Sequence, residues 1–134
     1  MKIENLKQKF FYMMTVGFGI FLLFFVITCT WIGYDVKSQC YEAKRQYKKD
    51  CTESLISLLL DEKQSFRQRN SAIWALGQLG DKRALPVLQK YYTANIPARE
   101  PLDQSISQYE LKKAINLAGG GLNITAFVWR NSIN

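Results

Sequence analysis

The chain has 134 residues, of which 18 are basic and 11 acidic, so its net charge at neutral pH is +7, and it contains no histidine. Without histidine, Ser–His and Cys–His nucleophiles are excluded, and the commonest protein ligand of metals is missing. The positive charge is dispersed, and neither a nucleic-acid recognition motif nor a phosphate-binding glycine loop is present. We therefore expect no enzymatic activity, cofactor, metal, small-molecule substrate or nucleic-acid partner.

The first predicted element is a membrane-spanning helix. After a short basic leader, residues 1–9, the 25 residues from Phe10 to Tyr34 contain no charge. A transmembrane helix needs about 20 mostly apolar residues, and aromatic residues at both ends of this run suit the two membrane interfaces. A cleaved signal peptide has an apolar region of only about 7–15 residues, followed by a small-residue cleavage site. We therefore expect an uncleaved anchor at residues 10–34.

The charges on either side of the run give opposing indications about the side of the membrane on which the rest of the chain lies. Basic residues flank the run on both sides, with Lys2, Lys7 and Lys9 before it and Lys37, Lys44, Arg45, Lys48 and Lys49 after it. The second group is slightly larger, and the positive-inside rule then favours a cytoplasmic domain. A basic leader directly before an apolar helix is instead typical of a signal-anchor, and long domains translocate largely regardless of charge. We favour an extracytoplasmic domain.

Two cysteines bear on the same question. Cys40 and Cys51 lie in a predicted juxtamembrane segment, residues 35–51. Either they form a disulfide, which implies an oxidising compartment, or they are two free thiols. Eleven steps along one straight helix would separate their Cα atoms by about 16 Å, whereas a disulfide requires less than about 7 Å. A disulfide therefore predicts that the chain turns between them.

The rest of the sequence has a helical pattern, so we expect an all-α protein. Apolar residues at helical spacing predict four helices, at 52–61, 66–79, 82–93 and 103–118, with a proline-containing loop at 95–101. Pro86 lies just past the first turn of the third helix and should bend it slightly. The helices form two similar pairs over residues 52–118, which suggests a short α-solenoid, followed by a tail at 119–134.

The segment from Arg69 to Leu88, RNSAIWALGQLGDKRALPVL, resembles the HEAT repeats of the short bacterial type, which also occur in phycobilin lyases. The pattern of these repeats is an arginine, small apolar residues, A-L-G-x-L-G-D-x-R-A, and an apolar residue followed by P-x-L. The resemblance implies a right-handed stack of helix pairs, without bilin chemistry, because no further lyase feature accompanies it. The residues with expected structural roles are Arg69, Gly77, Gly80, Asp81 and Pro86.

Two helix pairs make a short array, since about three repeats are usually needed for stability. We expect caps to make up the deficit, with the Cys40–Cys51 segment at one end and the tail over the last helix at the other. In the alternative, the tail inserts into the membrane interface, where tryptophan and arginine side chains such as those of Trp129 and Arg130 are favoured.

Trp74 is the main candidate for binding a partner. On a helical wheel it lies apart from the apolar stripe, beside Arg67, Asn70 and Gln78, and a tryptophan with an arginine nearby on a solvated face is typical of a binding hot spot. In the alternative, Trp74 packs against the first helix or the tail.

These features together predict a membrane-anchored, non-catalytic interaction or scaffold module that docks a protein partner. The first alternative is an accessory subunit of a larger membrane complex, whose span packs among partner helices through small residues such as Thr15 and Gly19. The second alternative is a pigment-handling or lyase-like factor.

Overall fold

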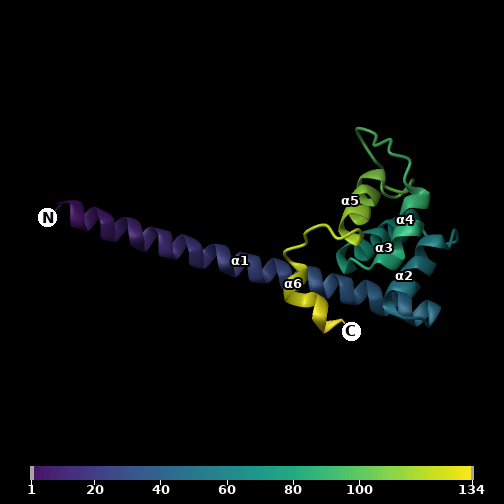
Figure 1. Ribbon diagram of the computed structural model, residues 1–134, viewed down its shortest axis with the longest axis horizontal. Coiled ribbons are helices and arrows are strands. Elements are labelled where there is room, and N and C mark those ends of the chain that lie inside the picture. The colour runs from purple at the N-terminus through teal and green to yellow at the C-terminus, as the bar shows by residue number, and fades with distance from the viewer. Residues whose placement is uncertain (1, 134) are drawn as a thin grey trace.

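The computed structural model describes residues 2–133, and every regular element within them is a helix. In chain order the elements are α1 (Lys2–Tyr47), α2 (Cys51–Leu60), α3 (Phe66–Leu79), η1 (Lys82–Ala84), α4 (Leu85–Tyr91), α5 (Gln108–Ala118), α6 (Ala126–Trp129) and η2 (Arg130–Ser132), where η marks a 3-10 helix. Met1 of the predicted leader and Asn134 of the predicted tail lie outside the described residues. The predicted all-α class with a long apolar N-terminal helix is confirmed (Figure 1).

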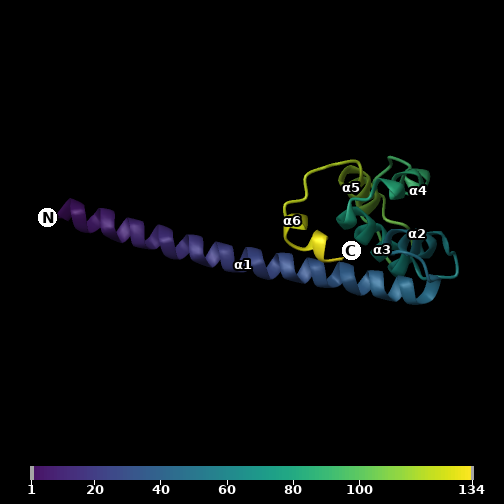
Figure 2. The ribbon, with the colours of Figure 1, turned by 60° about the horizontal axis from the view of Figure 1, so that its bottom comes forward.

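Helix α1 is one uninterrupted rod whose N-terminal half stands clear of the rest of the chain (Figure 1, Figure 2). It is long and apolar enough to cross a membrane, and its most apolar stretch is not buried inside the molecule. The hydroxyls of Thr15, Thr28 and Thr30 donate to carbonyl oxygens four residues earlier, so these groups are satisfied within the helix, as a hydrocarbon environment requires. The predicted end of the span at Tyr34 is not an end of the helix, which continues to Tyr47.

The second half of α1 belongs to the folded domain. Its buried positions include Cys29, Gly33, Val36, Cys40 and Ala43, whose spacing alternates between four and three residues. This spacing keeps the residues on one face of the helix, and we call that face the docking seam. Because the docking seam begins at Cys29, the domain packs on the last turns of the uncharged run as well as on the segment after it.

A tight turn after α1 brings the two cysteines of the juxtamembrane segment together. The turn passes through Lys48, which has a positive φ of 56°, and the Asp50 carboxylate then accepts a hydrogen bond from the Glu53 amide at 2.8 Å as the N-cap of α2. Cys40 and Cys51 form a disulfide with their Cα atoms 5.1 Å apart. In the chain-entropy description, closing a loop of this length stabilises the fold by about 3 kcal/mol.

The end of α1 and the helices α2 to α5 stack in two layers. Helices α1, α3 and α5 form a row in which α3 contacts both neighbours, while α2 packs against α1 and α3, and α4 packs against α5 (Figure 1). The core between the layers is aliphatic, and its fully buried large residues include Leu55, Leu59, Ile73, Leu76, Leu88 and Leu111. Each helix pair thus buries its apolar face against its neighbours, as in a solenoid.

The third predicted helix differs from the observed one. In place of one helix at 82–93 the structure has η1 and α4, which end at Tyr91, and Pro86 lies in the first turn of α4. A proline there loses no hydrogen bond and has a φ angle suited to starting a helix. Pro86 therefore helps to begin a helix instead of bending one. Helix α3, in contrast, has the predicted bounds, Phe66–Leu79.

Helix α5 begins five residues later than the predicted start at 103. Ser107 is its N-cap, because the Ser107 hydroxyl accepts a hydrogen bond from the Glu110 amide at 3.1 Å. The residues before Ser107 are held in a non-helical loop by a side chain of α3, described below. This tertiary contact competes with the helical pattern and shortens the helix.

After α5 the tail crosses back to α1 instead of covering the last helix (Figure 2). Helix α6 packs on the docking seam, where Trp129 joins Val36 and Ala126 in a small apolar cluster. A Cβ atom at Gly33 would lie only 2.6 Å from the Cβ of Trp129, so the glycine allows this close approach. The tail therefore closes the end of the domain that faces the free half of α1.

Candidate functional site

A groove crosses the row of helices α1, α3 and α5. Its lining residues are Asp35 and Gln39 of α1, Arg67, Asn70, Ser71 and Trp74 of α3, Leu102 and Asp103 of the loop, and Glu110 of α5. Solenoids bind partners on the extended surfaces that such rows of helices create. Three of the four residues predicted to bind a partner therefore lie in one groove, and only Gln78 does not line it.

The groove is acidic although the chain as a whole is basic. Its lining includes the carboxylates of Asp35, Asp103 and Glu110 but only one cationic side chain, Arg67, whereas the chain carries +7. A groove lined mainly by one sign of charge concentrates ligands of the opposite sign. The groove therefore suits a ligand with cationic groups.

Trp74 is half-buried at this groove. Its ring packs against the main core and also against the small cluster formed by Val36, Ala126 and Trp129. The rest of its surface lines the groove. Trp74 thus packs beside both α1 and the tail while part of its surface remains open to a ligand in the groove.

Asn70 is almost fully buried, with 6% of its surface exposed, and its side chain is used inside the protein. Its Nδ2 donates to the carbonyl oxygens of Leu102 at 2.9 Å and Ser105 at 2.8 Å, and its Oδ1 accepts from the Ser107 amide at 2.9 Å. These three bonds hold the loop before α5 on α3. Asn70 therefore positions one wall of the groove and has no free amide to offer to a ligand.

Glu100 fixes the same loop from its other end. Its carboxylate accepts hydrogen bonds from the Ser107 hydroxyl at 2.5 Å and from the amides of Gln108 at 2.6 Å and Tyr109 at 3.3 Å. Burial by itself would raise the pKa of this carboxyl, but the hydrogen bonds outweigh burial and hold the pKa of Glu100 below its ordinary value. The loop is therefore anchored at both ends of the groove wall.

Gln78 serves the tail rather than the groove. Its Oε1 accepts from Nδ2 of Asn123 at 2.8 Å, and its backbone oxygen accepts from Nη2 of Arg130 at 2.8 Å. Two buried donors of the tail, Trp129 Nε1 and Arg130 Nε, have no acceptor among the described residues. The tail is therefore held on α1 mainly by apolar contacts, and Gln78 forms hydrogen bonds with two of its residues.

Arg69 joins three helices. It is 7% exposed, and its Nε donates to the carbonyl oxygen of Leu59 at the end of α2 at 2.9 Å. Its guanidinium lies over the rings of Phe66 and Tyr91, 5.8 and 5.6 Å from the two centroids. The arginine of the repeat pattern thus connects α2, α3 and α4 and takes no part in the groove.

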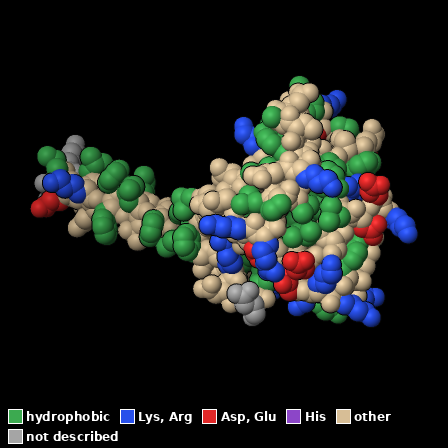
Figure 3. All heavy atoms as spheres, turned by 45° about the vertical axis from the view of Figure 1, so that its right-hand side comes forward, with side chains coloured by type: hydrophobic (Ala, Val, Ile, Leu, Met, Phe, Trp, Pro, Cys, Tyr) green, Lys and Arg blue, Asp and Glu red, His purple; other side chains and the backbone are tan. Residues whose placement is uncertain are grey.

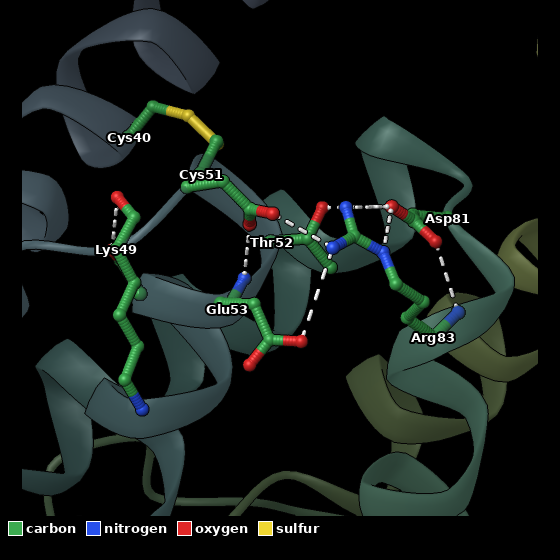
Figure 4. Close-up of a disulfide and its surroundings, with 9 residues drawn as sticks. Cys40, Lys49, Cys51, Thr52, Glu53, Asp81 and Arg83 are labelled. Atoms are coloured by element: carbon green, nitrogen blue, oxygen red, sulfur yellow. Dashed lines mark hydrogen bonds and ion pairs between the residues drawn. A yellow bond between two sulfur atoms is a disulfide. The ribbon is translucent and has the colours of Figure 1, made fainter.

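Figure 4 shows Asp81 in a polar cluster beside the disulfide. Arg83 donates to Asp81 Oδ2 through Nε at 2.9 Å and Nη2 at 2.7 Å, and to Asp50 Oδ2 through Nη1 at 2.7 Å. These hydrogen bonds are the main reason why the pKa values of both carboxyls lie below their ordinary value. Because the arginine is half-exposed, the cluster adds little stability, and its role is to fix the turn after α3 against the start of α2.

Gly77 and Gly80 have different structural roles. Gly80 ends α3 in the left-handed conformation, with φ of 65°, which glycine adopts without strain. Gly77 lies where α3 and α5 approach closely, since a Cβ atom there would be 2.8 Å from the Cα of Ala114. A side chain at position 77 would therefore push these two helices apart.

The segment made of α3, η1 and α4 has the form of one repeat unit. Residues 68–93 match the family model of the PBS lyase HEAT-like repeat. The match contains the whole segment from Arg69 to Leu88 on which the predicted resemblance rests, so the HEAT-like character of this part of the chain is confirmed. No curated protein and no solved structure matches the chain.

Several groove residues are not among the predicted site residues. The sequence could have indicated that Asp35 and Gln39 belong to the domain, because the alternating spacing that starts at Cys29 indicates that α1 continues into it. No pattern in the sequence indicates that Asp103 and Glu110 line the groove, because they reach it only through the folding of the loop onto α3. Among residues 2–133, no three side chains of His, Cys, Asp or Glu are placed to hold a metal ion.

Proposed function

We propose that the protein is a membrane-anchored, non-catalytic interaction module whose groove holds a segment of a protein partner. The apolar rod of α1 supports the anchor, and the HEAT-like stack supports the role in binding. The observation that carries the proposal is the placement of Trp74 beside Arg67 in a groove that spans three helices. Tryptophan and arginine are enriched among the residues that dominate binding energy at interfaces.

The chemistry of the groove favours a partner segment with basic and apolar side chains. The exposed part of Trp74 offers an apolar surface to the partner. The carboxylates of Asp35 and Asp103 complement lysine or arginine side chains of the partner, and the carboxylate of Glu110, which also accepts from Lys113 at 3.2 Å, adds to the negative charge. Asn70 and Glu100 hold the loop wall in place, so little ordering of this loop is needed on binding.

A photo-crosslinking amino acid at Ser71, in the groove, tests this function in cells. We expect an adduct with one partner at position 71 and none from the same group at Lys90, which is exposed on α4 outside the groove. Trp74→Ala and Glu110→Lys should each lower the adduct yield about tenfold or more, as expected for hot-spot contacts of at least about 1.4 kcal/mol. Equal adducts from positions 71 and 90, or an adduct insensitive to both substitutions, would contradict the proposal.

We further propose that the folded domain lies on the extracytoplasmic side of the membrane. The Cys40–Cys51 disulfide supports this side, because disulfides persist in oxidising compartments. The larger number of basic residues after the span favours the other side, but a domain of this size can translocate regardless of flanking charge.

Cysteine labelling of cells tests this orientation. In intact cells, a membrane-impermeant maleimide should label Lys90→Cys, whose side chain is exposed. In the unsubstituted chain, Cys40 and Cys51 should react with a maleimide after denaturation only when a reductant is present, whereas Cys29 needs no reductant. Labelling of Lys90→Cys only after the cells are permeabilised would place the domain in the cytoplasm.

The second candidate function is an accessory subunit whose span packs among the helices of a larger membrane complex. Gly17 and Gly19 favour it, because a Cβ atom at either position would meet nothing within 4 Å, which leaves room for a partner helix to approach closely. The family name of the matched repeat also leaves a lyase-type role as a third candidate. A chromophore bound to the purified protein would favour that role.

A further inference from the structure

The tail presents a row of unpartnered apolar side chains on its outer face. While Trp129 and Ala126 are buried against the docking seam, Phe127 is 78% exposed and Leu122 is 75% exposed. Ile124 and Val128 are also exposed. Four large apolar residues within seven positions are therefore directed away from the domain that holds the tail in place.

The position of the tail along α1 places this row at the edge of the expected hydrocarbon layer. The uncharged run contributes 19 residues, Phe10 to Thr28, before the docking seam begins at Cys29. At 1.5 Å per residue these residues span about 28 Å, which nearly matches the hydrocarbon thickness of about 30 Å. Trp129 packs at Gly33, one turn beyond Cys29, so α6 lies at the level of the membrane interface.

The surroundings of α6 fit that level. Trp31 and Tyr34 are exposed on the adjacent turns of α1, and both residue types prefer the membrane interface. In both ribbon views α6 lies at the end of the domain nearest the free half of α1 (Figure 1, Figure 2). The space-filling view shows hydrophobic side chains along the free rod up to the place where it enters the domain (Figure 3).

We propose that the tail is a second membrane contact, which inserts Leu122, Ile124, Phe127 and Val128 into the interface of the bilayer that α1 crosses. The inference rests on the proposed role of α1 as the anchor. A lipid surface is favoured over a protein partner because α6 packs on α1 at the depth where α1 must leave the membrane. The contacts of α1 and of the tail with the membrane together fix the tilt of the domain, and therefore the direction in which the groove faces. With α1 as the only contact, the domain would be free to rotate.

Depth-dependent fluorescence quenching tests this contact in the full chain. A single probe is attached at Phe127→Cys in a Cys29→Ala background, with matched probes at Val16→Cys within the free half of α1 and at Lys90→Cys on α4. The chains are reconstituted into phosphatidylcholine vesicles that contain lipids with a nitroxide near the headgroup or deep in the acyl chain. Phe127 and Lys90 are both exposed, so neither labelled variant should disturb the fold, and circular dichroism verifies this.

We expect the probe at 127 to shift to the blue and to lose most of its fluorescence with the shallow nitroxide, while the probe at 90 keeps its fluorescence. The probe at 16 should be quenched by the deep nitroxide. An unquenched probe at 127 beside a quenched probe at 16 would overturn the membrane contact and leave the anchor intact. A probe at 127 that is shielded from aqueous iodide yet unquenched by lipid would also overturn it, in favour of a protein cover. An unquenched probe at 16 would overturn the anchor itself.

Discussion

Gly77→Leu should destabilise the helical stack by about 3 kcal/mol, at the upper end of the cost of overpacking a core. At this position even a Cβ atom would lie 2.8 Å from the Cα of Ala114 and 3.0 Å from its Cβ. A backbone atom cannot move aside as the end of a flexible side chain can, so α3 and α5 must separate and lose the packing of the row. Urea unfolding of the full chain in detergent micelles, followed by circular dichroism, measures the loss.

Gly19→Leu is the matched control for this substitution. It adds the same side chain to a helical glycine where a Cβ atom meets nothing within 4 Å, so the unfolding midpoint of the domain should stay at its original value. If the two substitutions shift the midpoint equally, the close approach of α3 and α5 at Gly77 does not limit the stability of the domain.

Asn70→Ala should lower the free energy of unfolding by about 3 kcal/mol, because it removes three hydrogen bonds and leaves the buried amide of Ser107 without its acceptor. The bonds are 2.8 to 2.9 Å long, and the side chain is 6% exposed. The loop before α5 should come loose from α3, so amide hydrogen exchange at Ser107 should accelerate together with the fall in the unfolding midpoint. Since this loop forms one wall of the groove, the yield of partner adducts at Ser71 should fall as well.

Two further substitutions make this result specific. Asn70→Asp keeps the size of the side chain but loses both donors to Leu102 and Ser105, so it should be nearly as harmful as alanine. Asn116→Ala changes an exposed asparagine on α5 and should have little effect. Slow exchange at Ser107 in Asn70→Ala would show that Glu100 holds the loop without help, since Glu100 accepts from the Ser107 hydroxyl and the next two amides.

Most of the helices, including one long and apolar enough to cross a membrane, were predictable from the sequence because their signals are local. The bounds of α3 follow from its apolar period together with Ser65 at its start, which forms a capping box with Gln68, and Gly80 at its end. The length and uniform apolarity of the run from Phe10 to Tyr34 indicate a helix that can cross a membrane, since the hydrocarbon thickness sets the required length. The repeat pattern within 68–93 likewise lies in one continuous segment.

The groove and the path of the tail could not be predicted in this way, because they depend on contacts between residues far apart in the chain. The side chain of Asn70 bonds to a loop more than 30 positions away, and the side chain of Gln78 bonds to Asn123 across 45 positions. On a helical wheel both side chains point to the polar face, and only the packed structure shows that this face is covered. Local period and capping therefore determine where most helices of this chain lie, although the loop that Asn70 holds sets the start of α5. The folding of the loop onto α3 and of the tail onto α1 decides which polar residues stay exposed. The reason is that the burial of a helix face depends on what packs against it and not on the residues of that face alone.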